Sequence, residues 1–498
     1  MMTKNRFFVV HRTETWIWVV LACIFNIQAS AENIFDLVIA NGRVIDPASS
    51  TDAIRHIGVT SNRIAAVSEK PLSGIETIEA KGKVVTAGFI DLHSHAQTQL
   101  GQRYQVRDGV TTALDLEAGA YPVAAVANNI ADQALINFGA SASYASIRAK
   151  VLSNANQPYI FFNGKFFSFN DAAFTKQMDE VEIARAMRHV GVGLDQGGLG
   201  IGLLLDYMSV AVSDLELEAL FNTAADRHAP LFIHIRRGRA GDASGLTEVI
   251  ELAKRTGASI HICHLNASAM GGIDNFLQLI DHALVEGVDI SAESYPYNAG
   301  STSIGADVFR RDWKNIFGIT YKDIQLAETG EFLTKKRWNE LRAEDPGAII
   351  IHHYGREDWT RRAMESPAMM IGSDAMPIFS EKIRSHPRAI GTFSRVLAEY
   401  VRGSKILSLS EALSKMSYLP AKRLEVVAPK FKRKGRIQPG ADADIVIFNL
   451  DSIRDRATYD HPYSPSTGIM TVIVNGQIVV NEGAILPNVF PGLIVMGG

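Results

Sequence analysis

The sequence predicts an α/β fold, a (β/α)8 barrel of the TIM type with a small β-sandwich domain built from both ends of the chain. In the middle of the chain, short apolar runs alternate with segments of helical periodicity such as DEVEIARAMRHVGVGL, which is typical of parallel strands joined by helices. Both ends consist instead of short β-type runs separated by turn residues. A chain of 498 residues also exceeds the usual size of one core, so a large and a smaller domain are expected.

The first element is an export signal peptide, expected over residues 1–31. Basic residues precede the apolar run WIWVVLACIFNI, and Ala29 and Ala31 form an A-x-A cleavage signal. The run is about a dozen residues long, shorter than the roughly 20 that a membrane-spanning helix needs. We therefore expect cleavage after about Ala31, a periplasmic or secreted mature protein and no stable membrane span. A lipoprotein anchored at Cys23 is the alternative.

The small β domain is expected to combine residues 32–88 with residues 432–498. The first part contains the runs DLVIANGRVID, HIGVTSNRIAAV and TIEAKGKVV, and the second contains GRIQPGADADIVIFN and TVIVNGQIVV. Apolar runs broken by turn residues, among them N-G and P-G, predict short β-strands in both parts. Cleavage of the signal peptide would leave Cys263 as the only cysteine, so neither domain is expected to contain a disulfide.

The barrel is expected over residues 89–431, with eight strands. In chain order the strand sequences are GFIDLHSH, TTALDLE, NFGASASY, LGIGLLLD, PLFIHIR, SIHICHLN, VDISAESYPY and MMIGSDAM. An insertion over about 303–366 separates the last two strands. It is too long for an ordinary loop and contains the strand-like segment AIIIHHYG, so we expect it to form a lid over the active site.

Polar residues occur at the ends of the predicted barrel strands, where the active sites of such barrels lie. His93 and His95 are two positions apart at the end of the first strand, so their side chains point to the same side. Taken singly, a strand histidine could be a core residue, Glu117 a solvated loop carboxylate and Asp374 a helix cap. Coincidence at so many strand ends is improbable, and nitrogen and carboxylate ligands suit zinc. The expected ligands of one or two zinc ions are His93, His95, Glu117, His234, His264 and Asp374.

A zinc site of this composition predicts hydrolysis. Zinc lowers the pKa of its bound water to about 7, so a metal-bound hydroxide is available as a nucleophile at neutral pH. Asp374 would act as general acid and base, taking a proton from the attacking water and returning it to a leaving amine. Nucleic-acid binding is disfavoured, because the formal charge is −3, the isoelectric point is near 6.5 and no basic tract contains interleaved aromatic residues.

With these residues in place, nearly all of the mature chain resembles the amidohydrolase superfamily and, more narrowly, the N-acyl-D-amino-acid deacylases. The wider resemblance is carried by GFIDLHSH, the strand histidines and GSD, and the narrower one by SYPYNAGST, IGSDAMP, SHPRAIGTFSRVLAEYVR and GRIQPGADADIVIF. The resemblance implies that the histidines hold the metal and that Asp374 is catalytic. It also implies that Arg388 and Tyr295, with Ser301 nearby, bind the free carboxylate of the substrate, which a guanidinium suits chemically. A surface salt bridge is the alternative role of Arg388.

The sequence departs from the family pattern in its bridging ligand. The family has a metal-bridging cysteine after the second strand, where this chain has Ala118, so the neighbouring Glu117 is the expected substitute. The fourth strand, LGIGLLLD, contains no lysine, so the carboxylated-lysine bridge of dihydroorotase-like and hydantoinase-like relatives has no obvious donor. Lys165 is an unorthodox candidate for that bridge, and an exposed loop lysine is the simpler interpretation.

The sequence also departs from the family pattern around the substrate. A family lysine after the histidine of the sixth strand is replaced by Asn266, and acidic residues that follow the fifth strand give way to HIRRGR. Arg236, Arg237 and Arg239 in this segment predict either a pocket for an acidic or larger substrate or, more simply, a solvated basic loop.

The leading hypothesis is zinc-dependent hydrolysis of the amide bond of an N-acyl amino acid, a small molecule with a free carboxylate. The D configuration is implied by the resemblance alone. One alternative is an exported metallo-dipeptidase or carboxypeptidase of the same superfamily, since Arg388 would bind a terminal carboxylate equally well. An alternative of another class is a non-catalytic binding protein on the same fold. The acyl group, the preferred side chain, the number of metal ions and the oligomeric state are left open.

Overall fold

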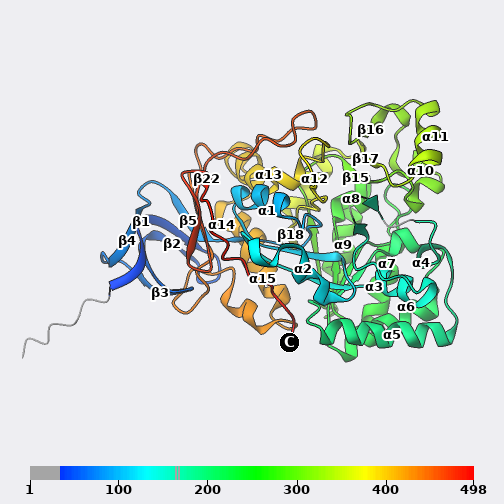
Figure 1. Ribbon diagram of the computed structural model, residues 1–498, viewed down its shortest axis with the longest axis horizontal. Helices are drawn as coiled ribbons and strands as arrows, with labels where there is room; N and C mark the ends of the chain where they lie inside the picture. The colour runs from blue at the N-terminus through cyan, green and yellow to red at the C-terminus, as the bar shows by residue number, and fades with distance from the viewer. Residues whose placement is uncertain (1–33, 163–164, 167–168) are drawn as a thin grey trace, which may run out of the picture.

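The computed structural model describes residues 34–162, 165–166 and 169–498 (Figure 1). The expected signal peptide, with Ala31 and Cys23, lies outside the described residues, as does the side chain of Lys165. No helix in the described part of the chain is long and apolar enough to cross a membrane.

The predicted barrel is confirmed: seven of the eight predicted runs contain one of its strands, and the run TTALDLE lies within the longer strand β7. All neighbouring strands pair in parallel, in the order β18-β14-β13-β12-β11-β8-β7-β6. A single parallel bridge between Ser94 and Ala375 links the regions that follow the first and last strands, so the sheet nearly closes. The strands are β6 (Phe89–Asp91), β7 (Val110–Ala120), β8 (Asn137–Ser143), β11 (Ile201–Leu203), β12 (Leu231–Ile233), β13 (Ile260–Ile262), β14 (Ile290–Ser294) and β18 (Met369–Ile371).

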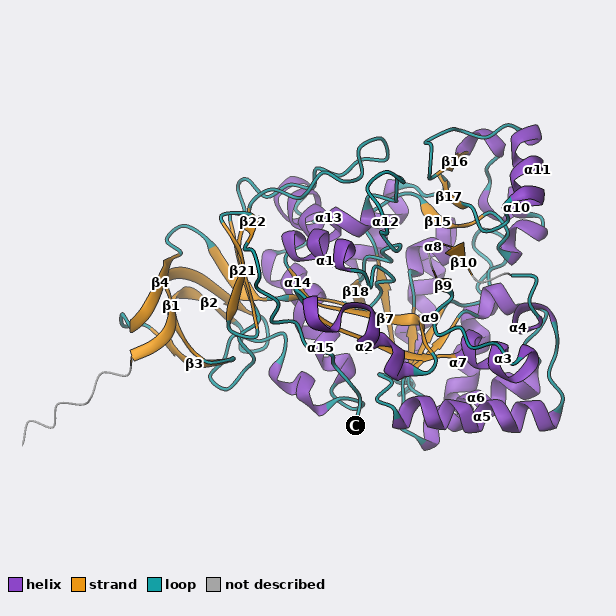
Figure 2. Cartoon of the chain, viewed as in Figure 1, coloured by secondary structure: helices purple, strands orange, loops and turns teal. Residues whose placement is uncertain are grey.

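Helices surround the barrel sheet, and their ends follow local capping rules (Figure 2). Helix α5, for example, begins with a capping box in which Asp179 and Glu182 each accept a hydrogen bond from the other's backbone N–H. Its residues Ile183, Ala186 and Val190 are buried, so one face packs on the barrel. The principal helices are α1 (Gln99–Gln105), α2 (Ala127–Ile130), α3 (Tyr144–Ser153), α4 (Ala172–Thr175), α5 (Glu180–Asp195), α6 (Asp214–Asp226), α7 (Ser244–Thr256), α8 (Leu265–Ala269), α9 (Ile273–Val285), α12 (Glu357–Glu365), α13 (Arg388–Arg395), α14 (Leu409–Leu413) and α15 (Leu419–Leu424).

Strands from both ends of the chain form one nine-stranded sheet beside the barrel, at the left of Figure 1. The two ends join where β5 pairs antiparallel with β19, and Ile57, Val85 and Ile473 belong to one apolar core across this junction. Apolar side chains from each end of the chain are therefore buried against those from the other end. The strands are β1 (Ile34–Asp46), β2 (Thr51–Thr60), β3 (Arg63–Ser68), β4 (Ser73–Glu79), β5 (Val84–Ala87), β19 (Ile445–Phe448), β20 (Ile469–Val474), β21 (Gln477–Asn481) and β22 (Ala484–Ile485).

The segment between β14 and β18 contains a separate three-stranded sheet, ordered β15-β17-β16. The segment AIIIHHYG contains its central strand. Phe309, Trp313 and Trp338 pack against one another, and Phe309 also packs against His352 of this strand. The elements are β15 (Gly300–Ser303), β16 (Ile324–Leu326), β17 (Ile349–His352), α10 (Trp313–Phe317) and α11 (Lys335–Glu344). His352 and Tyr354, at the end of β17, line the pocket described next, so this segment contributes one of its walls.

Candidate active site

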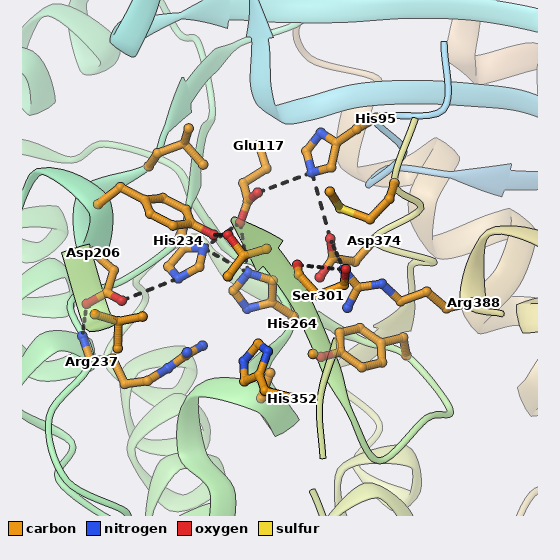
Figure 3. Close-up of a pocket in the computed structure, with 18 of the residues that line it drawn as sticks. His95, Glu117, Asp206, His234, Arg237, His264, Ser301, His352, Asp374 and Arg388 are labelled. Carbon is orange, nitrogen blue, oxygen red and sulfur yellow. Dashed lines mark hydrogen bonds and ion pairs between the residues drawn. The ribbon is translucent and has the colours of Figure 1, made fainter. Parts of the chain in front are cut away.

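A pocket of about 580 Å³, including the part that opens to solvent, lies at the carboxyl ends of the barrel strands (Figure 3). This is the end of a (β/α)8 barrel at which catalytic residues are expected. The sequence-predicted residues that line it are His95, Glu117, His234, His264, Tyr295, Ser301, Asp374 and Arg388. His93, the remaining predicted ligand, is buried beneath them with its ring nitrogen against that of His95.

His93 and His95 present the same ring nitrogen to the pocket. Their Nε2 atoms lie 3.2 Å apart. Each Nδ1 is held from behind by a buried carboxylate, at 3.0 Å from Glu293 for His93 and 3.0 Å from Asp115 for His95. A carboxylate behind an imidazole fixes the ring orientation and makes the opposite nitrogen a better ligand. The pair is therefore oriented to bind a metal ion.

His234 and His264 form a second pair, on the opposite side of Glu117. The Nδ1 atom of His234 lies 3.1 Å from the Nε2 atom of His264. Burial and the proximity of His264 hold the pKa of His234 below its usual value, which favours the neutral imidazole that a metal requires. His264 has φ of 35°, in the left-handed region, so the backbone turns sharply at the end of β13.

Glu117 lies between the two histidine pairs and faces both of them. One carboxylate oxygen, Oε1, is 3.0 Å from His234 and 2.8 Å from His264. The other, Oε2, is 3.2 Å from His93 and 3.4 Å from His95. Burial opposes ionisation of Glu117, but the neighbouring histidines His93 and His264 hold the pKa of this carboxyl well below its usual range. A solvated loop carboxylate is the wrong interpretation, because Glu117 lies within β7 and is only 4% exposed.

Asp374 follows the last barrel strand and faces the first histidine pair. Its Oδ1 atom is 3.5 Å from Nε2 of His93 and 3.7 Å from Nε2 of His95. Its φ of 51° is also in the left-handed region, which non-glycine residues adopt at a cost of order 1 kcal/mol or more. The strained backbone aims the carboxylate at the pocket rather than along the strand.

Within the described part of the chain, three groups of side chains could each hold a metal ion, with ligand atoms within 4.8 Å of one another. One group combines Glu117 with His234 and His264, and another combines His93 with His264 and Asp374. These donors are the nitrogens and carboxylate oxygens that suit zinc. The third group adds Cys263 to His93 and Glu117. The residues thus fit one or two zinc ions, and the two oxygens of Glu117 face the two histidine pairs.

Arg388 forms the wall beside Asp374. The two side chains make an ion pair of 2.9 Å, and the Arg388 guanidinium lies 4.7 Å over the Tyr295 ring. Arg388 is 1% exposed, and its Nε and Nη1 atoms have no hydrogen-bond partner. The Ser301 hydroxyl is likewise buried without a partner. A surface salt bridge is therefore the wrong interpretation of Arg388, and its unpaired donors suit a carboxylate in the pocket.

Comparison with known proteins identifies the family. Residues 323–480 match the amidohydrolase family model. N-acyl-D-glutamate deacylase of Alcaligenes xylosoxydans xylosoxydans is 30% identical over 486 residues, which cover 92% of this chain and 96% of the relative. The chain belongs to the N-acyl-D-amino-acid deacylases of the amidohydrolase superfamily. It is therefore a metal-dependent amidohydrolase, and a non-catalytic binding protein is not supported.

Other amidohydrolases of this group are similar over comparable lengths. D-aminoacylase of Alcaligenes xylosoxydans xylosoxydans is 26% identical, over 90% of this chain and 95% of the relative. Among solved structures, N-acyl-D-glutamate deacylase from Bordetella bronchiseptica has a TM-score of 0.77 and 27% identity, covering 93% of this chain and all of the other. That structure is complexed with zinc and a phosphonate inhibitor that mimics the tetrahedral intermediate of the reaction.

Several residues of the amidohydrolase site were not predicted from the sequence. Asp115 and Glu293 hold the histidines from behind, and the signal that could have found them is a carboxylate inside an otherwise apolar strand run. Asp206 ends the fourth strand run and lies 3.8 Å from His234. His352 and Tyr354 reach the pocket from the insertion, and no local pattern indicates this.

The basic segment HIRRGR of the amidohydrolase divides into three environments. Arg236 forms an ion pair with Glu248 away from the pocket, and Arg239 is exposed. Arg237 is buried and lines the pocket, so a solvated loop is the wrong interpretation for this residue.

Proposed function

We propose that this amidohydrolase cleaves the amide bond of N-acyl-D-amino acids, releasing a carboxylic acid and the free amino acid. The observation that carries the proposal is the convergence in one pocket of a metal-ligand set, Asp374 and the unpaired donors of Arg388. A metal-ligand set without Arg388 would suit many hydrolases. A buried guanidinium beside the general acid and base selects substrates with a carboxylate near the scissile bond. The D configuration is supported by the relatives.

His93, His95, His234, His264 and Asp374 would hold the zinc, and Glu117 would supply a carboxylate between the two histidine pairs. Zinc, when bound, acidifies water for attack and polarises the amide carbonyl. Glu117 takes the part of the cysteine expected in the family, because its two oxygens face different histidine pairs. A carboxylate among the histidines would contribute one negative charge, which would limit the net positive charge of the pocket when zinc is bound.

Asp374 is the proposed proton carrier. It accepts the proton of the attacking water and donates it to the amide nitrogen, so that the C–N bond breaks as a neutral amine leaves. Arg388 holds the α-carboxylate through Nε and Nη1, with the hydroxyls of Ser301 and Tyr295 nearby. Fixing the carboxylate places the scissile carbonyl at one position relative to Asp374, which is the positioning that amide hydrolysis requires.

The test is amine release from a panel of N-acyl-D-amino acids, their L enantiomers and dipeptides, with zinc-loaded mature protein and Asp374→Asn as the control. Asp374-dependent turnover confined to the acyl-D set is the expected result. Turnover of dipeptides alone would instead support a metallo-dipeptidase or carboxypeptidase, whose terminal carboxylate Arg388 would hold in the same way. No turnover of any member by zinc-loaded protein would contradict the proposal.

Export to the periplasm or the medium is a further part of the proposal, supported by the A-x-A signal at Ala29 and Ala31. Fractionation of cells that express the full chain, with N-terminal sequencing of the product, tests it. A mature protein that begins near residue 32 outside the cytoplasm is expected. A cytoplasmic protein with an intact N-terminus would contradict it.

A further inference from the structure

A second guanidinium, that of Arg237, enters the same pocket as Arg388. We infer that Arg237 binds a second carboxylate of the substrate, so that the preferred substrates are N-acyl amino acids that carry another carboxylate besides the one held by Arg388. The inference rests on the proposed function, since it assigns the second anionic group of that substrate.

The buried guanidinium of Arg237 makes no ion pair within the described part of the chain, although, against the effect of burial, the charge of Asp206 helps to raise the pKa of Arg237. It lies three residues after His234 in the loop that follows β12, and it is 8% exposed. Its Nε atom is buried and has no hydrogen-bond partner. Within the described residues, no carboxylate oxygen lies within 4.0 Å of a nitrogen of this guanidinium. A buried cation in this state is costly unless a ligand supplies the missing anion.

The nearby carboxylate of Asp206 is already occupied by other groups. It accepts hydrogen bonds from the guanidinium of Arg311 at 2.7 Å and from the backbone N–H of Arg237 at 2.8 Å. Its contact with Arg237 is therefore to the main chain, which fixes the loop and leaves the side chain to the pocket. The Arg237 guanidinium lies 5.3 Å from the centre of the Phe317 ring, and this cation–π contact positions the charge without neutralising it.

Arg237 and Arg388 face the same space from opposite sides of His352 (Figure 3). Arg388 uses one nitrogen for Asp374 and has Nε and Nη1 unpaired. Burial, together with the charges of Arg237 and Arg388, holds the pKa of His352 well below its usual value, so the residue between the two cations stays neutral. Two buried guanidiniums, each with donors that have no hydrogen-bond partner, lie around one neutral side chain and suit a ligand with two separate anionic groups.

The second carboxylate has two chemical sources. It can belong to the side chain of the amino acid, as in an N-acyl-aspartate or N-acyl-glutamate, or to a dicarboxylic acyl group, as in an N-succinyl amino acid. The two sources share the recognition chemistry, and matched substrates separate them.

The experiment compares kcat/KM for two matched pairs on zinc-loaded protein. N-acetyl-D-glutamate is paired with N-acetyl-D-glutamine, and N-succinyl-D-alanine with its succinamoyl counterpart, so that each pair differs only in a carboxylate and an amide. The enzymes are the wild type, Arg237→Met, Arg237→Lys and the exposed control Arg239→Met. A charge-assisted hydrogen bond predicts an acid-over-amide preference of about 10- to 100-fold in one pair. The pair that shows it identifies the source.

Arg237→Met should reduce that preference to about 1, Arg237→Lys should restore part of it, and Arg239→Met should keep it. A preference unchanged in Arg237→Met, or no preference in either pair while the amides are hydrolysed, would overturn the inference. Failure of the proposed function is distinguishable, because it would leave all four compounds uncleaved. The binding of the same compounds to the zinc-loaded wild type and to Arg237→Met, measured by calorimetry, would then test whether Arg237 binds the second carboxylate. Equal affinity of the wild type for the acid and the amide would contradict that role.

Discussion

Replacing Arg388 by methionine removes the proposed carboxylate clamp while keeping much of the side-chain volume. The guanidinium is 1% exposed, makes an ion pair of 2.9 Å with Asp374 and leaves Nε and Nη1 for a ligand. The substitution therefore affects substrate binding and, through Asp374, the groups that carry out the chemistry.

The size of the effect follows from the burial of the pair. Removing one partner of a buried, hydrogen-bonded charge pair costs about 2 to 5 kcal/mol. At about 1.4 kcal/mol per factor of ten, kcat/KM should fall by about 30-fold to several thousand-fold. Because zinc ligation does not use Arg388, the zinc content should stay at the wild-type level.

The assay is steady-state amine release from an N-acyl-D-amino acid at a fixed zinc concentration, with metal content measured on the same samples. Arg384→Met is the matched control, since Arg384 precedes the same helix α13, is 39% exposed and lies outside the lining of the pocket. Arg384→Met should behave like the wild type. Kinetics of Arg388→Met within about twofold of the wild type, at equal zinc content, would refute the carboxylate clamp.

Three further outcomes are expected. Glu117→Ala should lower the zinc content measured by mass spectrometry from about two ions per chain to one or fewer, because both ions lose a ligand; equal content in the two proteins would remove Glu117 as the bridge. Glu293→Gln should weaken zinc binding about 10- to 100-fold, because it replaces the carboxylate that holds His93 from behind. The exposed control Glu251→Gln should bind zinc like the wild type. Equal zinc affinity in Glu293→Gln and the wild type would show that His93 does not need this carboxylate. Zinc removal by a chelator should lower the melting temperature by roughly 5 °C, since a ligand at 100 times its Kd stabilises the folded protein by about 2.7 kcal/mol. Re-addition of zinc should restore the melting temperature. A melting temperature insensitive to zinc would show that zinc does not bind within the folded barrel.

The barrel and most of the metal-ligand residues could be predicted from the sequence, because both follow from local rules. Parallel strands buried on both faces read as apolar runs, so His234 in LFIHIRR and Asp374 in IGSDAMP stand out against their neighbours. The rule that strands of one barrel end at one edge then brings residues from distant parts of the chain together. Glu117 is an example of this rule, because its position in β7 places it between the two histidine pairs.

The rest of the site depends on packing between distant segments, which leaves no local signal. His352 lies in the small sheet of the insertion, and its approach to the pocket is set by the pairing of β15 with β17. Arg237, whose guanidinium lies over the Phe317 ring of the insertion, is buried, whereas Arg239, two positions later, is exposed. Sequence patterning therefore predicts the chemistry of this site better than its specificity.

The most direct test of the proposed function measures amine release from one N-acyl-D-amino acid and its L enantiomer by zinc-loaded wild type and Asp374→Asn, with zinc content determined in parallel. We expect turnover of the D compound by the wild type and a loss of about 100-fold or more in Asp374→Asn, which should still bind zinc through the histidines and Glu117. Equal rates in the two proteins, or a zinc-loaded wild type that cleaves neither enantiomer, would contradict the proposed function.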